Sequence, residues 1–543
     1  TDIKYIFKSN KDKKINFLIN KGKFLNLDIQ KSSIAINFKD NKKIIKSKIK
    51  TTGISKYPEV KIISSLLGLD LNSIKNIELT SDLETSVNLS LDNKYTITDR
   101  AFLVNGKINY LNLEHKEVKS IKKFLPSYNS MIILKDTEIA FDQNNNLKLS
   151  GQIKFDKKFE DFLLNYSSLK NNNFIMDGKI NLQELSLKFP KINYFKDKNT
   201  GANLDFIING SKSGYDLNHL IYSSEKTNIL LGRIKLNKKL QIKDIAKIKV
   251  KTFFNDIKNN DFQIERSNKK NIVIYGALFD AEPFLKSLYK KDDRKALSKS
   301  FSSEIKVNFD KAITGSDDDI SNFSMIASVK KGSYNKLNLK GNFSENEIIE
   351  MSIYEVDSNT RTLQVISDRA RPFIKNFGFI KGFEGGKLEY ESTIAKEVTN
   401  SNLLITNFKV SKVSALAQLL TLASLQGIAD TLSGEGIRFE SFEMKSNSKG
   451  NVMNIEDALA MGPAVSILLS GYVDKGKVVS LRGTLVPATK LNSIIASIPL
   501  VGDILVGKKT GEGVVGVSFK MKGPPKDIKT TVNPIKTLTP RFI

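Results

Sequence analysis

Apolar and polar residues alternate along most of this chain, in short runs separated by clusters of Asn, Asp, Lys and Gly. Clear examples are Val87, Leu89 and Leu91, and then Ile305, Val307 and Phe309. Successive side chains of a strand point to opposite faces, so this pattern predicts many strands with one apolar face each. We therefore predict a mainly β fold with short α-helices, in which antiparallel strands form an elongated, curved sheet with an open groove.

Helical spacing is confined to a few segments. Besides the two amphipathic ones described below, they are Val60–Leu69, Val118–Leu125, Phe159–Leu169, Glu282–Ser298 and Asp368–Phe377. The apolar face of each strand must still be covered, either by a second layer of protein or by something that is not protein.

Two amphipathic segments stand out in the last third, residues 414–432 and 490–505. In the first, Leu416, Leu419 and Leu420 share a face. In the second, Leu491, Ile494, Ile495 and Ile498 do so, and Pro499 stops or kinks the helix. Either segment can contact a membrane or close the end of a groove, or it can pack on the sheet. Neither has a strongly basic polar face, which favours packing.

The chain is basic, with 85 Lys and Arg against 58 Asp and Glu among 543 residues and a net charge of +27. Such a charge is compatible with nucleic acid or an anionic membrane as partner. However, the lysines are spread along the chain between apolar residues, as on solvated strand faces, and no RNA-binding aromatic motif is present. We therefore expect no nucleic-acid partner, unless the lysines gather on one face.

Residues for covalent chemistry are sparse. The chain has no cysteine, which fits an oxidising compartment, and its two histidines, His115 and His219, lie in unrelated contexts. The string from Gly502 to Thr510 resembles a phosphate-binding loop, but Lys509 stands where Ser or Thr must hold magnesium. Acidic runs such as Asp317-Asp318-Asp319 look solvated. We predict no enzyme activity, no metal site and no cofactor.

The last third carries a set of short motifs in a fixed order. They are Leu432–Glu440 (LSGEGIRFE), Gly462-Pro463, Arg482–Pro487 (RGTLVP), Leu491–Ile495 (LNSII), Ile498–Leu505 (IPLVGDIL), Gly511–Gly513, Gly523-Pro524, Val532–Pro534 and Leu538–Pro540. With these motifs the chain resembles the C-terminal region of the AsmA-like superfamily, in its YhdP-type branch of bacterial bridge-like lipid transfer proteins. Two positions depart from that pattern: Val506 replaces a further glycine, and Pro525 follows Pro524.

The resemblance implies a division into residues 1–360, with β-groove segments and short helices, and residues 361–543, the AsmA-like region with its helical lid near the C-terminus. It also implies a periplasmic protein, anchored in the inner membrane through an N-terminal helix absent from this chain. The function it implies is non-enzymatic transport of phospholipid along an apolar β-groove between the inner and outer membranes of a Gram-negative envelope. The expected partners are phospholipids, both membranes and membrane proteins.

Under this hypothesis alternating residues of the C-terminal strands line the groove. The candidates are Val465, Ile467, Leu469, Leu481, Leu485, Val515, Val517 and Phe519. An alternative is a scaffold or assembly factor for outer-membrane proteins, without lipid transfer, in which side chains fill the groove. The two differ in the interior: bulky packed residues throughout favour the scaffold, and an uncovered apolar trough favours transport.

Overall fold

Strands make up 73% and helices 6% of this computed structural model, which confirms the mainly β fold with few short helices. The structure describes residues 2–8, 13–39, 42–67, 71–117, 122, 124–268, 270–287, 299–315, 318–357, 359–374, 382–395, 397–411, 414–422, 434–474, 476–487, 517–525 and 527–533. The predicted lid at 490–505 lies outside these residues. The chain divides into two compact units, Thr1–Lys258 and Asn259–Ile543.

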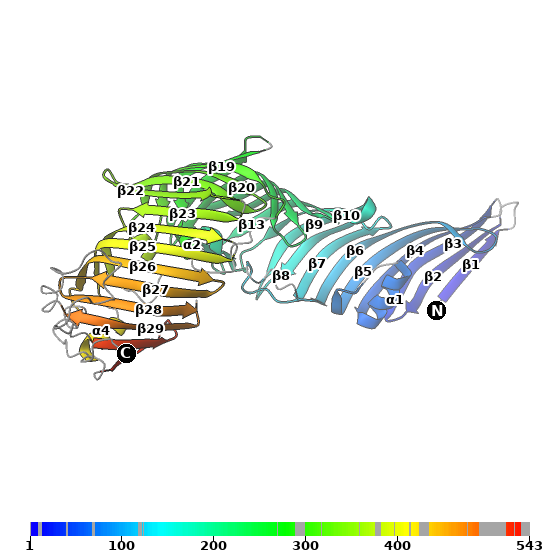
Figure 1. Cartoon of the computed structure of the whole chain (residues 1–543). Helices are drawn as coiled ribbons and strands as arrows, with labels where there is room; N and C mark the ends of the chain where they lie inside the picture. Colours follow the sequence, from blue (N-terminus) through cyan, green and yellow to red (C-terminus); the bar gives the residue numbers. More distant parts are fainter. Residues whose placement is uncertain are drawn as a thin grey trace, which may run out of the picture. The chain divides into compact units, whose positions relative to one another are not determined.

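The first unit contains a curved, open antiparallel sheet in which each strand pairs with the next one along the chain (Figure 1). Its strands are β1 (Asp2–Lys8), β2 (Lys14–Phe24), β3 (Leu27–Lys39), β4 (Lys42–Lys56), β5 (Ile74–Leu91), β6 (Ile97–His115), β7 (Met131–Asp142), β8 (Leu147–Lys154), β9 (Phe159–Leu169), β10 (Asn173–Asn181), β13 (Ala202–Ser211), β14 (Gly214–Ser224), β15 (Thr227–Asn237) and β16 (Ile242–Phe254). Helix α1 (Tyr57–Leu67) and the small hairpin β11 (Leu187–Phe189) and β12 (Tyr194–Lys196) are inserted between these strands, and short 3-10 turns lie at Lys170–Asn172 and Pro190–Ile192.

The second unit contains a similar sheet. Its strands are β17 (Ile257–Arg266), which belongs to this unit from Asn259 on, β18 (Asn271–Asp280), β19 (Ser303–Ile313), β20 (Ile320–Lys330), β21 (Ser333–Ser344), β22 (Glu347–Glu355), β23 (Thr360–Ser367), β24 (Phe383–Ala395), β25 (Val398–Val410), β26 (Ile437–Lys449), β27 (Val452–Met461), β28 (Val465–Asp474), β29 (Val478–Pro487), β30 (Val517–Gly523) and β31 (Lys529–Asn533). Its helices are α2 (Glu282–Ser287), α3 (Arg371–Ile374) and α4 (Ser414–Leu422). The pair β18–β19 is parallel, and the other described pairs of this unit are antiparallel.

The two edges of the second sheet differ. The long connections all start at the edge where β18 ends: residues 281–302, 368–382, 411–436 and 488–516. The opposite edge has short connections at residues 267–270, 331–332, 356–359, 396–397, 450–451, 475–477 and 524–528, and the connection 281–302 reaches this edge at the start of β19. We call these the insertion edge and the hairpin edge. In this unit, any insertion that covers a face of the sheet therefore starts from one side.

Most predicted elements are confirmed. Helix α1 matches the predicted segment Val60–Leu69, and α2, α3 and α4 lie within predicted segments whose remaining residues fall outside the described part. The predicted helix at Phe159–Leu169 is wrong, because this segment is strand β9. A short apolar run is compatible with the period of a helix and with that of a strand. Here the segment pairs with β8 on one side and with β10 on the other, and it is therefore a strand. Most of the predicted helix Val118–Leu125 lies outside the described residues.

Glycines permit close strand contacts in this fold. Gly106 in β6 has a φ of +146°, and a Cβ there would lie 2.2 Å from the carbonyl oxygen of Asp82 in β5. We expect Gly106→Ala to lower the free energy of unfolding by about 1–3 kcal/mol, because both the backbone conformation and the ladder resist the added carbon. Gly201→Ala, where no atom lies within 4 Å, is the matched control in the same unit. Urea unfolding followed by circular dichroism measures both, and equal stabilities would contradict the expectation.

Candidate functional site: the apolar face of the sheet

Strand register brings the sequence-predicted lining residues to one face of the second sheet. Directly opposed residues of an antiparallel pair point to the same side. Ile467 opposes Leu485, which in turn opposes Val517. The other members alternate with these along the same strands, so seven of the eight candidates share this face: Val465, Ile467, Leu469, Leu481, Leu485, Val517 and Phe519. Val515 lies outside the described residues.

Part of this face is covered by protein. Val465 and Leu485 are fully buried, and Ile467 and Phe519 nearly so, in a cluster that includes Leu419 and Leu420 of α4. Leu469, Leu481 and Val517 are half-buried. The described part of the amphipathic segment 414–432 therefore packs on the sheet as a core helix. Among the candidates, four are inaccessible to an external ligand in this conformation.

An ionic network holds the short helix α3 on the same face. Arg369 contacts Asp318 (2.9 Å) and Glu347 (2.5 Å), and Arg371 contacts Asp318 (2.6 Å). Asp318 is buried, so the prediction of a solvated acidic run is wrong at this residue, and the two guanidinium groups provide the donors that its carboxylate needs. The Arg369 hydrogen bond, with a further one from Ser344, lowers the pKa of Glu347. Ile374 of α3 is buried in the cluster that contains Leu388.

Beyond α3 and α4 the apolar face of the second unit is only partly covered. One row of opposed residues crosses β21, β22 and β23 through Leu337, Ile353 and Leu363. A parallel row passes through Tyr390, Leu403 and Met444 on β24, β25 and β26. All six side chains are half-buried. These rows leave apolar surface within reach of solvent or of a ligand.

The first unit has an equivalent apolar face. Ile15, Ile36, Ile45 and Leu89 oppose one another across β2, β3, β4 and β5. The half-buried apolar side chains of this face include Ile15, Phe17, Ile34, Ile36, Ile45, Ile49, Leu83, Val87, Leu89, Val104, Phe141 and Leu147. Helix α1 packs near Ile77 and Ile108 through Tyr57 and Val60. Much of this face has no described second layer of protein, which gives the fold its groove-like character.

The surface area supports this description. The chain has a solvent-accessible surface of 32663 Å². A compact monomer of 60.8 kDa is expected to have about 20,000 Å². A single sheet layer exposes both of its faces, whereas two packed layers bury two, so uncovered sheet faces contribute to this larger area.

A flap formed by residues 182–199, which contains β11 and β12, covers one stretch of the apolar face in the first unit. Tyr194 and Tyr222 of β14 share a hydrogen bond of 2.7 Å between their hydroxyls. Lys196 is 2% exposed, and its Nζ donates to the carbonyl oxygens of Gln183 (3.0 Å), Leu185 (2.8 Å) and Asp197 (3.0 Å). The flap is thus fastened by a buried ammonium group that satisfies three carbonyls at once.

Glu160 of β9 holds the start of the flap. Its carboxylate accepts hydrogen bonds from the backbone N–H groups of Gln183 (2.6 Å) and Glu184. Burial raises the pKa of Glu160 and lowers the pKa of Lys196, although the backbone hydrogen bonds to Glu160 and the attraction of Lys196 to Glu160 favour the charged forms. We favour the charged forms, since each group has several partners of the right polarity. The sequence contains a sign of this site. Glu160 alternates with Phe162 and Leu164, so a charged residue stands where the pattern of the strand expects an apolar one.

The opposite face of the first sheet is charged and solvated. Lys48 and Lys50 both contact Glu84, at 2.8 and 3.5 Å, and Lys107 contacts Asp136 at 2.7 Å. These lysines are more than 40% exposed. Acidic residues are interspersed with the lysines here, so these lysines do not form a purely cationic surface.

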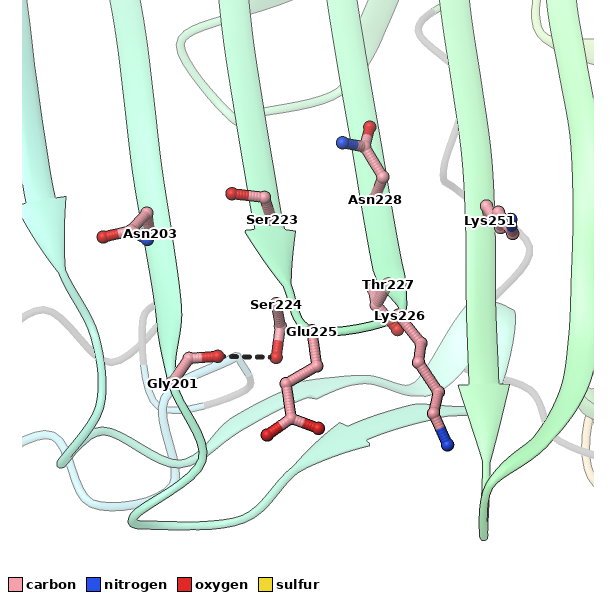
Figure 2. A pocket seen from close by; sticks show the side chains of 9 residues that line it. All are labelled: Gly201, Asn203, Ser223, Ser224, Glu225, Lys226, Thr227, Asn228 and Lys251. Carbon is pink, nitrogen blue, oxygen red and sulfur yellow. Dashed lines mark hydrogen bonds between the residues drawn. The ribbon is translucent and has the colours of Figure 1, made fainter.

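A shallow polar hollow lies on this charged face, at the ends of β13 to β16 (Figure 2). It has a volume of about 400 Å³ and is lined by Gly201, Asn203, Ser223, Ser224, Glu225, Lys226, Thr227, Asn228 and Lys251. Ser224 donates to the carbonyl of Gly201 (2.8 Å), and Lys226 pairs with Asp256 (3.0 Å). These groups have partners within the protein, and we assign the hollow no ligand.

The described residues give little support to a metal site, a phosphate-binding loop or a membrane-spanning helix. His115 bonds to Tyr128 and to a backbone carbonyl, and no group of three or more potential metal ligands occurs in that part of the chain. The near-match to a phosphate-binding loop at 502–510 lies outside it. None of the helices there has the length and hydropathy needed to cross a bilayer. Comparisons with protein-family models, curated proteins and solved structures give no match for this chain.

We expect the α3 network to weaken in acid. The pKa of Glu347 is lowered in the folded chain, so its contribution is complete above the ordinary value of 4.5 and is lost as the pH falls below it. Between pH 6 and pH 3.5, the thermal midpoint of unfolding should therefore fall less in Glu347→Gln than in the wild type. The difference should develop over the pH range of roughly one ordinary carboxyl titration. Glu350→Gln, which removes only an exposed pair with Lys340, is the control. Identical pH dependence of all three proteins would contradict this assignment.

We also expect Lys196→Met to open the flap. It removes the Nζ donor from three carbonyls, of which that of Leu185 is buried and that of Gln183 keeps the Asn199 N–H, and we expect a cost of about 2–4 kcal/mol. Amide hydrogen exchange over residues 182–199 should accelerate at least tenfold. Lys198→Met, which removes an exposed ion pair with Asp156, should cost less than about 1 kcal/mol. Equal exchange in the two variants would refute the fastening role of Lys196.

Proposed function

We propose that this chain moves phospholipid along the apolar face of its sheets, without enzymatic chemistry, between the inner and outer membranes of a Gram-negative envelope. The single observation that carries the proposal is the continuity of half-buried apolar rows across successive strands, such as Ile15, Ile36, Ile45 and Leu89. The AsmA-like motifs of the last third support the envelope setting, the periplasmic location and the membrane anchor.

The energetics favour acyl chains as the missing layer. Apolar surface removed from water is worth about 25 cal/mol per Å², or roughly 0.8 kcal/mol for each buried CH₂ group. A face made of Ile, Leu, Val and Phe offers no directional contacts, so bound chains can shift from one strand to the next without breaking hydrogen bonds. Lysines at the strand ends supply donors for lipid phosphates.

A scaffold for outer-membrane protein assembly is the second candidate. The packed cluster around Val465, Leu485 and Phe519, where α4 fills the face, favours it. The uncovered rows of the first unit favour transport. The discriminating measurement is therefore made in the first unit, away from α4.

A photo-crosslinking amino acid at Val87 should capture lipid in cells, because Val87 lies on the apolar face and is half-buried. The same amino acid at Asn88, the next residue on the opposite, exposed face, is the control. We expect lipid adducts at Val87 to exceed those at Asn88 by about tenfold, since only the first position contacts acyl chains under this proposal.

Native mass spectrometry of the purified protein gives the complementary readout, and co-purified phospholipid is expected. If Val87 cross-links only to protein and the native mass spectrum shows no bound lipid, the transport proposal is contradicted and the scaffold remains as the candidate function. Lipid adducts at both positions alike would indicate non-specific membrane contact.

A further inference from the structure

A patch of hydroxyl groups interrupts the apolar face of the second unit. Ser392, Ser401 and Ser446 oppose one another on β24, β25 and β26, and Thr399 and Ser448 oppose one another in the next row. We call these five residues the hydroxyl patch. All lie on the apolar face, because they alternate with Tyr390, Leu403 and Met444 along the same strands.

The patch has unused hydrogen-bonding capacity. Ser392 is 1% exposed, and its Oγ has no partner among the described residues. Ser401 and Ser446 share one hydrogen bond of 2.9 Å, which uses one of their two protons. Buried hydroxyls normally have a partner, and elsewhere on this face Ser367, which is also 1% exposed, donates to the carbonyl of Arg369. An unpartnered hydroxyl in an apolar face indicates a missing acceptor.

The patch also has a definite place across the width of the sheet. The apolar rows that contain Ile405 and Phe442 run toward the insertion edge, where α3 and α4 pack. The row of Thr399 and Ser448 runs next to the short turns at 396–397 and 450–451, at the hairpin edge. On β24, β25 and β26, polarity on this face therefore increases from the insertion edge to the hairpin edge.

A cation completes the series. Arg361 of β23 opposes Ile394, which opposes Thr399, so Arg361 belongs to the outermost row of the patch. It is half-buried and donates to the carbonyl of Tyr334, which occupies one of its five N–H groups. Glu355 lies opposite Arg361 on β22, and its carboxylate accepts from Asn335.

From these observations we propose that the patch and Arg361 form a binding subsite for the polar end of a diacyl glycerophospholipid. The order across the sheet is apolar rows, hydroxyls, then a guanidinium. A phospholipid has the same order of acyl chains, ester carbonyls and phosphate. Ser401 donates to an ester oxygen, Ser392 donates to a second one after the lipid displaces the side chains that now bury it, and Arg361 contacts the phosphate. This inference rests on the proposed function and adds to it the orientation of the lipid, with its polar end toward the hairpin edge.

The test uses three probes on the full chain: dihexanoyl phosphatidylglycerol, dihexanoylglycerol and the hydrocarbon diphenylhexatriene. Binding of the two lipids is titrated by native mass spectrometry, and binding of the hydrocarbon by fluorescence. The triple variant Ser392→Ala/Ser401→Ala/Ser446→Ala should bind both lipids about tenfold more weakly and the hydrocarbon as well as wild type does. Arg361→Gln should lose about tenfold for the phosphatidylglycerol alone, and Arg361→Lys should restore most of it.

The matched control is Thr393→Ala/Thr406→Ala, which removes hydroxyls from the opposite face of β24 and β25. Should the triple variant fail to fold, Ser392→Ala serves alone, because removing an unpartnered buried hydroxyl does not lower stability. If wild type binds none of the probes, the proposed function itself fails. If wild type binds both lipids and the triple variant binds them equally well, or the control is weakened as much, the transport proposal stands and the subsite is overturned.

Discussion

The structure depends on one constraint: in an antiparallel sheet, opposed residues point to the same side, so a one-residue slip would move every apolar side chain to the charged face. The register keeps Ile15, Ile36, Ile45 and Leu89 in one row across four strands. Where the chain adds an extra residue, bulges absorb it, as between Lys135 and Glu138. Each face therefore keeps its own chemistry over a long series of strands.

Because of this constraint, one face of each sheet is apolar, and other parts of the protein cover that face only in places. Helix α4, helix α3 and the flap at 182–199 each cover a stretch and bury residues that belong to the same alternation as the uncovered ones. The flap and α3 are held by polar contacts, through Lys196 and Arg369, whereas α4 packs through the apolar side chains of Leu419 and Leu420. The groups that fasten the flap and α3 are charged, while the surface beneath them is apolar.

The sequence was enough to predict the strands, their apolar faces and most helix positions, because period-2 alternation is a local property of the chain. It also placed seven of eight lining candidates on a common face. It did not separate the uncovered part of that face from the part under α4, because this depends on where a helix inserted between β25 and β26 returns to the sheet. Phe159–Leu169 was mistaken for a helix for a related reason, since only the neighbouring strands decide its period.

The pairing of each strand with its neighbour along the chain has a consequence for how the protein forms. Most ladder contacts join residues close in sequence, so relative contact order is low for so large a β protein, and loop closure costs little at each step. Strands can be added one at a time from a folded end of the chain, each on the template of the previous one. By the same logic, a related chain can gain or lose a hairpin without disturbing the rest, as in repeat proteins.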